Sequence, residues 1–155
     1  MTKTLSAHGL IRLGAWTKSA YASVAHLRDQ CPFGIAFELP PEWRTKHNVV
    51  YAFVMGDTVR YVGETTRGMT SRFEGYRYGN PAPLDTDNRV KLAITQALGN
   101  DEEVSIWAGQ PIANLSLPSG EKLKIPACKP LEEHLIHRIQ PDLNVKSIFQ
   151  PNAAP

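Results

Sequence analysis

The sequence contains few cysteines, no long apolar run and almost no excess of charge of either sign. Cys31 and Cys128 stand apart without a CxxC pair, so neither a disulfide framework nor a thiol-based metal site is expected. The longest apolar stretches, such as 49–55, are too short to cross a membrane, and no continuous apolar core follows the N-terminus as a secretory signal requires. We therefore expect no contact with a membrane and a cytoplasmic location.

The balance of charge gives little indication of a partner. Seventeen Lys and Arg against 15 Asp and Glu leave a formal net charge of +2, which by itself does not indicate nucleic acid. Residues 1–48 carry six basic and three acidic side chains, whereas residues 81–120 carry two basic and five acidic ones. An anionic ligand is therefore expected to avoid the middle of the chain.

The remaining composition is that of one globular domain. With 155 residues, 42% of them hydrophobic, the chain is long enough to bury its own core. The predicted helices span 17–30, about 70–79, 88–98 and 131–139. The predicted strands span 33–39, 49–55, 59–62, 104–108 and the two arms of a hairpin over 115–125. This order predicts an α+β fold with a small, mainly antiparallel sheet, of three strands or slightly more, flanked by helices.

Two local features sharpen these predictions. Ser71 and Glu74 have the spacing of a capping box at the start of the second helix, and Gly79 supplies its end. A three-residue loop over 56–58 would pair Tyr51 with Gly63 and place Tyr51 and Tyr61 on one face of the sheet, whereas a two-residue loop would place them on opposite faces. Taken alone, both tyrosines are typical of half-buried sheet positions.

Several short motifs together resemble the GIY-YIG nuclease family. The segment 49–51 stands ten residues before 61–63, and Arg72 and Tyr76 follow. The pattern E-x-x-L-I and then P-x-x-N comes near the end of the chain, at Glu132, Leu135, Ile136, Pro141 and Asn144.

Different parts of the chain are similar to different branches of that family. The closing pattern resembles the excision-repair subunit, whereas the run 50–78, with Tyr76 where the family usually has His, is more similar to the compact restriction endonucleases. Val49 replaces the Gly of the first motif, which implies a change of packing and not of chemistry. The resemblance covers about 48–145, so we expect a nuclease core over 48–155 and an N-terminal helical extension over 1–47 that packs on or beside it.

The resemblance implies a metal-dependent endonuclease that hydrolyses DNA phosphodiester bonds, with restriction-type cleavage of both strands favoured over repair or nicking. Its catalytic residues would be Tyr51, Tyr61, Arg72, Tyr76 and Glu132. Tyr51, with its pKa lowered by nearby positive charge, would accept a proton from the attacking water, and Tyr61 would orient that water or the phosphate. Tyr76 would hydrogen-bond the phosphate or Tyr51. Glu132 would hold one Mg²⁺, for which Mn²⁺ can substitute.

Arg72 would neutralise the scissile phosphate, and the chemistry of Arg72 and Glu132 is compatible with the roles that the resemblance implies. Arg72 lies four residues before Tyr76 on one helix face, and a guanidinium binds phosphate through two parallel hydrogen bonds, although most arginines are simply solvated. Glu132 lies beside the apolar stripe that Leu135 belongs to and Glu133 on the outer side, so Glu132 is the candidate ligand. Its alternative is a carboxylate favoured by the helix dipole.

The predicted partners are double-stranded DNA, a second copy of the chain and a cognate methyltransferase that acts on the same DNA site. Arg67, Arg72, Arg77 and Lys129 are the candidate contacts to DNA phosphates, and Asn144 is expected to tie down the backbone after the last helix. A dimer follows from restriction chemistry, because one site per chain cuts both strands of a palindrome only in a two-fold pair. A DNA-binding module without catalysis and an α+β interaction protein with accidental motifs are the rival interpretations.

Overall fold

The computed structural model describes residues 2–20, 31–79 and 86–144. Its helices are α1 (Thr2–Ala7), α2 (Pro41–Arg44), α3 (Met69–Tyr78), α4 (Thr86–Gly99) and α5 (Cys128–Ile139). Its strands are β1 (Ile11–Ser19), β2 (Gly34–Glu38), β3 (Val49–Met55), β4 (Thr58–Thr65), β5 (Val104–Gly109), β6 (Ile112–Ser116) and β7 (Lys122–Pro126). Among these described residues, no helix is long and apolar enough to cross a membrane.

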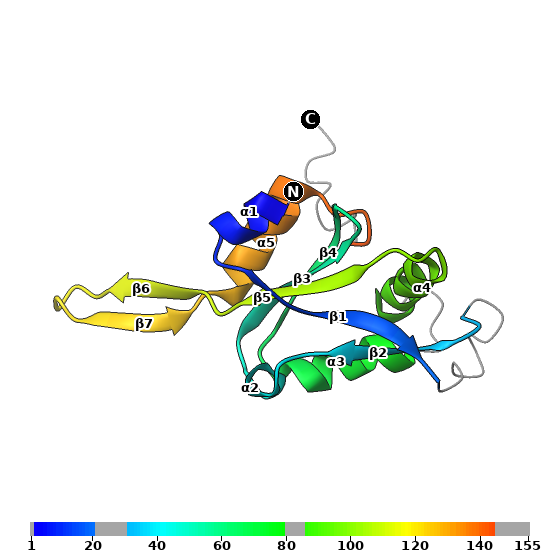
Figure 1. The fold of residues 1–155 in the computed structure, drawn as a ribbon. Coiled ribbons are helices and arrows are strands. Elements are labelled where there is room, and N and C mark those ends of the chain that lie inside the picture. The colour runs from blue at the N-terminus through cyan, green and yellow to red at the C-terminus, as the bar shows by residue number, and fades with distance from the viewer. Residues whose placement is uncertain (1, 21–30, 80–85, 145–155) are drawn as a thin grey trace.

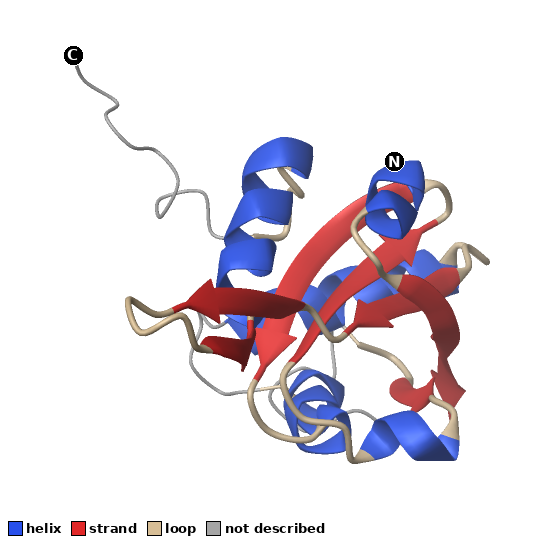
Figure 2. Cartoon of the chain, turned by 90° about the vertical axis from the view of Figure 1, so that its left-hand side faces the viewer, coloured by secondary structure: helices blue, strands red, loops and turns tan. Residues whose placement is uncertain are grey.

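Five of the strands form one sheet in the order β2-β1-β5-β3-β4, and every neighbouring pair in it is antiparallel. Figures 1 and 2 show helices on both sides of this sheet. The predicted α+β class with a mainly antiparallel sheet flanked by helices is therefore confirmed, with two strands more than the smallest sheet expected. Strands β6 and β7 pair only with each other.

The N-terminal part of the chain differs from the predicted helical extension. Strand β1 takes up the start of the predicted helix 17–30, whose last ten residues, 21–30, lie outside the described residues. β1 lies between β2 and β5, so the described part of 1–47 is an integral piece of the sheet. The physical reason is tertiary, because Trp16 is buried against Phe53 and Phe73, which come from distant parts of the chain.

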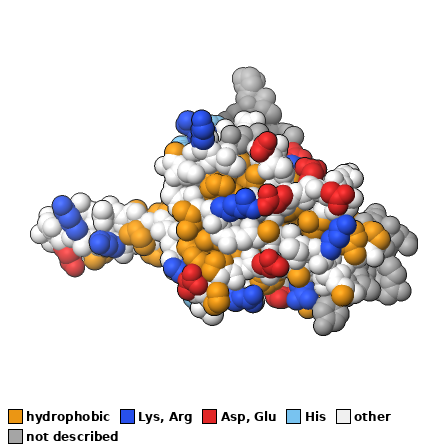
Figure 3. Space-filling view, viewed as in Figure 1, with side chains coloured by type: hydrophobic (Ala, Val, Ile, Leu, Met, Phe, Trp, Pro, Cys, Tyr) orange, Lys and Arg blue, Asp and Glu red, His pale blue; other side chains and the backbone are white. Residues whose placement is uncertain are grey.

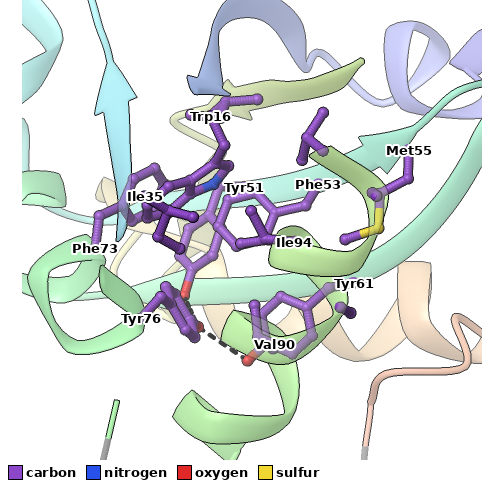
Figure 4. Close-up of a cluster of buried hydrophobic side chains, with 14 of the residues drawn as sticks. Trp16, Ile35, Tyr51, Phe53, Met55, Tyr61, Phe73, Tyr76, Val90 and Ile94 are labelled. Carbon is purple, nitrogen blue, oxygen red and sulfur yellow. Dashed lines mark hydrogen bonds between the residues drawn. The ribbon is translucent and has the colours of Figure 1, made fainter. Parts of the chain in front are cut away.

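Each face of the sheet is covered by a different pair of helices. The face toward α3 and α4 carries a core that includes Trp16, Tyr51, Phe53, Phe73 and Ile94 (Figure 4). The opposite face, toward α1 and α5, carries a second core that includes Leu5, Val50, Val62, Leu135 and Ile136. Strand β3 is buried on both faces, so it reads as a continuous apolar run and not as an alternating one.

The turn of the β3–β4 hairpin differs from the predicted three-residue loop. Met55 pairs with Thr58, so the loop has two residues, and Gly56 adopts a φ of 60° there. The register then shifts, because Val54 pairs with Val59 but Phe53 pairs with Tyr61. Arg60 is the extra residue of a β-bulge.

The bulge restores the predicted pairing that the short loop alone would have destroyed. Phe53 pairs with Tyr61 and Tyr51 with Gly63, as expected. Val59 therefore packs in the core under α5, while Tyr61, two residues on, packs in the core under α3. Tyr51 and Tyr61 share one face of the sheet for a reason other than the one predicted.

Helix ends were predicted less well than helix centres. Helix α3 has Gly68 at its N-cap without a side-chain cap, so the predicted Ser71–Glu74 capping box is wrong, whereas Gly79 ends the helix with a φ of 73° as expected. Helix α4 begins two residues before 88 and helix α5 three residues before 131. Boundaries depend on packing against the rest of the fold more than on local signals.

Strands β6 and β7 form an arm that projects from the body of the molecule (Figures 1 and 3). Directly opposite residues share a face, so one face of the arm carries Ala113, Leu115, Leu123 and Ile125. The other carries Asn114, Ser116, Lys122 and Lys124, together with the Ile112–Pro126 pair. Both faces are largely exposed, which is unusual for the apolar one.

The junction between β1 and the end of β2 predicts a strict requirement for glycine at position 14. A Cβ there would lie 1.8 Å from the backbone oxygen of Glu38, which cannot move aside as a flexible side chain would. Gly14→Ala should lower the free energy of unfolding by about 1–3 kcal/mol or more in urea denaturation, as overpacking does. Gly99→Ala is the matched control, because no described residue has an atom within 4 Å of that Cβ, and it should change stability by less than about 0.5 kcal/mol. Equal stability of both variants and wild type would contradict the close approach at Gly14.

Candidate active site

Three tyrosine hydroxyls meet where β3, β4 and α3 pack together (Figure 4). The Oη atoms of Tyr51 and Tyr76 are 2.6 Å apart, and the Tyr76 hydroxyl donates to the Tyr61 Oη at 3.1 Å. Tyr51 and Tyr76 are fully buried, and Tyr61 is buried as well but keeps 7% of its surface exposed. Three hydroxyls in contact inside an apolar core satisfy one another's hydrogen bonds.

Gly63 makes room for the Tyr51 hydroxyl. The two residues are directly opposite each other in the β3–β4 ladder, and a Cβ on Gly63 would lie 2.6 Å from the Tyr51 Oη. A glycine in the interior of a strand marks the close approach of another group, and here that group is the phenol ring. The glycine of the second motif therefore shapes the site without contributing a functional group.

Arg72 is the cation next to the tyrosine cluster. Its guanidinium carbon lies 4.1 Å from the centroid of the Tyr76 ring, and its Nη1 donates to Asp87 Oδ1 at 3.0 Å. The side chain remains 30% exposed. The structure therefore brings together four predicted site residues: Tyr51, Tyr61, Arg72 and Tyr76.

Burial dominates the electrostatics of the phenols. It is the largest cause that raises the pKa of Tyr51 and Tyr76 well above the ordinary value of 10.0 and also raises the pKa of Tyr61. The Arg72 charge lowers the pKa of all three but does not outweigh burial. The expected lowering of the Tyr51 pKa is therefore wrong in its net direction, because the arginine stands at the edge of an apolar core and not in water.

Glu132 occupies the half-buried side of α5. Its side chain is 13% exposed, whereas the neighbouring Glu133 is exposed, as the apolar stripe predicted. Because α5 begins at Cys128, Glu132 lies beyond the first turn, so the alternative of a carboxylate favoured at the helix N-terminus is wrong. Burial raises its pKa, a hydrogen bond from Lys129 opposes this, and Glu64 raises it further.

The charge of Glu132 reaches the tyrosine cluster. It raises the pKa of both Tyr51 and Tyr61, although its effect on each is smaller than that of burial. Lys129 Nζ donates to Glu132 Oε2 at 3.0 Å, and Glu64 on β4 adds a second negative potential. The Glu132 carboxylate is therefore paired with one cation, and it acts on the phenols through its charge.

The donor set around Glu132 fits a hard cation that keeps most of its water. No group of three or more His, Cys, Asp or Glu suited to a metal occurs in the part of the chain that the structure describes. One carboxylate, already paired with a cation, is compatible with Mg²⁺, which is often bound through one or two carboxylates plus water and phosphate. Burial raises the pKa of the neighbouring Cys128 thiol to about 11, so this sulfur is not a suitable ligand.

The predicted DNA-contact residues do not behave alike. Arg67 is exposed, and no ion pair involves it within the described residues. Arg77 is paired with Glu74 at 3.5 Å and Lys129 with Glu132 at 3.0 Å, so both already have carboxylate partners, as Arg72 has in Asp87. All four residues remain predicted contacts.

One contact of the site was not predictable, because no local signal in the sequence indicates it: Asp87 on α4 pairs with Arg72 on α3. The amide of Asn144 was expected to fix the backbone, and it does so on β4, where it accepts from the backbone N–H of Val62 at 3.0 Å and donates to its carbonyl oxygen at 2.7 Å.

Comparison with known proteins gives a likeness of fold. The chain matches no protein-family model, and no curated protein matches its sequence. Its structure is similar to a mutant of bacteriophage T4 EndoII, with a TM-score of 0.62 and 20% identity over 94% of this chain and 98% of that one. Restriction endonuclease HPY188I in complex with product DNA gives a TM-score of 0.49 and 14% identity, over 99% of this chain and 81% of that one.

The raised pKa values predict that the folded state loses stability at high pH. The phenols ionise near pH 10.0 in the unfolded chain but resist ionisation when folded. Their contribution is fully present below pH 10 and is lost as the pH rises toward the folded pKa values. The free energy of unfolding, measured by urea denaturation, should therefore fall between pH 9 and 11, by at most about 1.4 kcal/mol per pH unit for each phenol.

A pair of variants isolates the cluster as the source of this loss. Tyr76→Phe removes one buried phenol and should reduce the slope of stability against pH. Tyr78→Phe is the matched control, because Tyr78 is exposed and lies outside the cluster. An identical slope in wild type and Tyr76→Phe would contradict the assignment.

Proposed function

We propose that the protein is an endonuclease of the GIY-YIG type that hydrolyses DNA phosphodiester bonds. The observation that carries the proposal is the convergence of Tyr51, Tyr61, Tyr76 and Arg72 on one hydrogen-bonded cluster with Glu132 in electrostatic reach. The sequence motifs contain the same five residues. The likeness of fold to T4 EndoII over 94% of the chain supports the same conclusion.

Arg72 is the group that would bind the scissile phosphate. A guanidinium stays charged at any working pH and offers paired donors that match phosphate oxygens. Its stacking on Tyr76 and its contact with Asp87 leave it partly exposed, so a phosphate can approach it from solvent. At the edge of an apolar core its charge is weakly screened, which favours stabilisation of the growing negative charge.

The three tyrosines have different proposed roles, which follow from how deeply each is buried. Tyr51 and Tyr76 have the most strongly raised pKa values, so they act as neutral phenols that fix the hydrogen-bonded cluster. Tyr61 is the one of the three phenols that keeps exposed surface; burial raises its pKa, and the Arg72 charge opposes that rise. Tyr61 therefore keeps the role of orienting the attacking water, and we move the acceptance of the water's proton from Tyr51 to Tyr61, which would accept it as the phenolate, the form that the Arg72 charge stabilises.

Glu132 is the residue that would hold one Mg²⁺, or Mn²⁺ in its place. The bound cation would stabilise the phosphate and the leaving 3′ oxygen as a Lewis acid. Lys129 would then give up its hydrogen bond to the Glu132 carboxylate and become available to a DNA phosphate.

The biological setting that we propose is restriction of double-stranded DNA, with a methyltransferase that protects the same site. Similarity of the run 50–78 to the compact restriction endonucleases favours it over repair or nicking. The rival of an inactive DNA-binding module accounts less well for a complete set of site residues.

Cleavage of plasmid DNA with Mg²⁺ tests the function and the role of Glu132 together. Wild type should give discrete fragments, and Glu132→Gln should lose at least about 100-fold in rate while it still binds DNA in Ca²⁺. Glu133→Gln, one residue away and exposed, is the matched control and should cleave normally. An inactive Glu133→Gln with an active Glu132→Gln would reverse the assignment, and nicks alone would favour repair or nicking.

We further propose that two copies associate through the apolar face of the β6–β7 arm. This face carries Ala113, Leu115, Leu123 and Ile125 and no charge, whereas the opposite face carries two lysines that would repel their copies. Two-fold contact between identical faces is self-complementary.

Light scattering after gel filtration should give the mass of two chains for wild type and of one chain for Leu123→Lys. Lys124→Ala, on the opposite face, is the control and should leave the dimer intact; a monomeric wild type would refute this association.

A further inference from the structure

Asp87 and Arg72 form a contact between two helices beside the candidate site. Arg72 lies on α3 and Asp87 in the first turn of α4, and their side chains meet at 3.0 Å with 30% and 21% exposure. A pair exposed to this degree adds little to stability by Coulomb attraction alone. Its position next to the tyrosine cluster points instead to control of where the guanidinium lies.

Two contacts fix the Arg72 guanidinium in different directions. The Tyr76 ring lies against its face at 4.1 Å from the ring centroid to Cζ, and Asp87 accepts a hydrogen bond from Nη1. An arginine side chain has several rotatable bonds, so an unheld guanidinium loses conformational entropy whenever it binds a ligand. A guanidinium that is fixed on two sides before the ligand binds avoids most of that loss, and its donors stay directed at one phosphate position.

Gly75 provides the space in which this pair forms. It is three residues after Arg72, on the same side of α3, and a Cβ there would lie 2.9 Å from Asp87 Oδ2 and 3.0 Å from Arg72 Nη1. Glycine in the middle of a helix is less favourable than alanine, so its presence needs a reason. Both contacts are with the far ends of side chains, which means that a methyl group would displace the pair and leave the helix intact.

We propose that Asp87 is a positioning residue that holds the Arg72 guanidinium ready for the scissile phosphate, and that Gly75 is the position that permits this contact. The inference rests on the proposed function and deepens it, because it adds two residues that the motifs do not include. Asp87 acts through Arg72 and touches neither the phosphate nor the water.

Gly75→Ala separates positioning from folding. Both charged groups are retained and the helix propensity rises, so the melting temperature should stay equal or increase. The single-turnover rate of duplex cleavage should nevertheless fall by about 10- to 100-fold, because a displacement of about 1 Å at a reacting centre has an effect of this size. Gly99→Ala makes the same change in α4, where no atom of residues 2–20, 31–79 or 86–144 lies within 4 Å of the new methyl group, and it should cleave as wild type does.

Variants of Asp87 supply the second arm of the experiment. Asp87→Asn keeps an oxygen acceptor for Arg72 and should retain most of the rate, whereas Asp87→Ala should lose about as much as Gly75→Ala. Glu103→Gln is the control for the loss of an ion pair. It removes the charge of the exposed partner of Arg12, outside the candidate site, and this variant should cleave DNA as wild type does. Wild-type single-turnover rates in both Gly75→Ala and Asp87→Ala would overturn the inference and leave the proposed function in place.

A measurement without cleavage keeps the two proposals distinguishable. In wild type the side-chain Nε–H resonance of Arg72 should be sharp by NMR, and it should shift on addition of inorganic phosphate. In Gly75→Ala it should broaden and respond to phosphate only at a higher concentration. If wild type does not cleave DNA with Mg²⁺ or Mn²⁺, the proposed function fails, and an identical Arg72 resonance and phosphate response in both proteins would then overturn the inference as well.

Discussion

The register shift at Arg60 is the constraint on which the candidate site depends. The two-residue turn would place Tyr61 on the face of α5, and the extra residue returns it to the face of Tyr51. The segment after α5 holds this bulge: Asp142 forms two hydrogen bonds of 2.8 Å with the Arg60 guanidinium, and the Leu143 N–H donates to the Arg60 carbonyl oxygen at 3.0 Å. Asn144 adds two hydrogen bonds to the backbone of Val62. The closing P-x-x-N motif thus acts on the geometry of a strand about 80 residues earlier in the chain.

Placement at the boundary of the core gives the site its electrostatic character. Two phenols are fully buried and their pKa values rise, while the nearby guanidinium remains partly open to solvent. An apolar surrounding strengthens the field of a single arginine, but it also makes ionisation of a buried phenol costly. The cluster is therefore better suited to fixed neutral hydrogen bonds around one cation than to a set of groups that ionise.

Parts of the fold and of the site were predictable because their signals are local. The turn at Gly56, the apolar run of β3 and the stripe on α5 gave the hairpin, the central strand and the difference between Glu132 and Glu133. The strand character of Ile11–Ser19 was missed, since its partners β2 and β5 lie elsewhere in the chain and supply the burial of Trp16. The start of α3 was not predictable from its local sequence either, because Gly68 stands at the N-cap and no side chain caps the helix.

The sequence by itself determined which residue types the site contains and roughly where they fall on strands and helices: two tyrosines ten residues apart, an arginine and a tyrosine one helical turn apart, and a carboxylate beside an apolar stripe. Only the tertiary structure decided how they meet and how they ionise. The bulge at Arg60 depends on hydrogen bonds from residues 142–144, the Arg72–Asp87 contact joins two helices, and the raised phenol pKa values follow from burial by the whole core. A local pattern cannot encode these features, because each is a property of groups that become neighbours only when the chain folds.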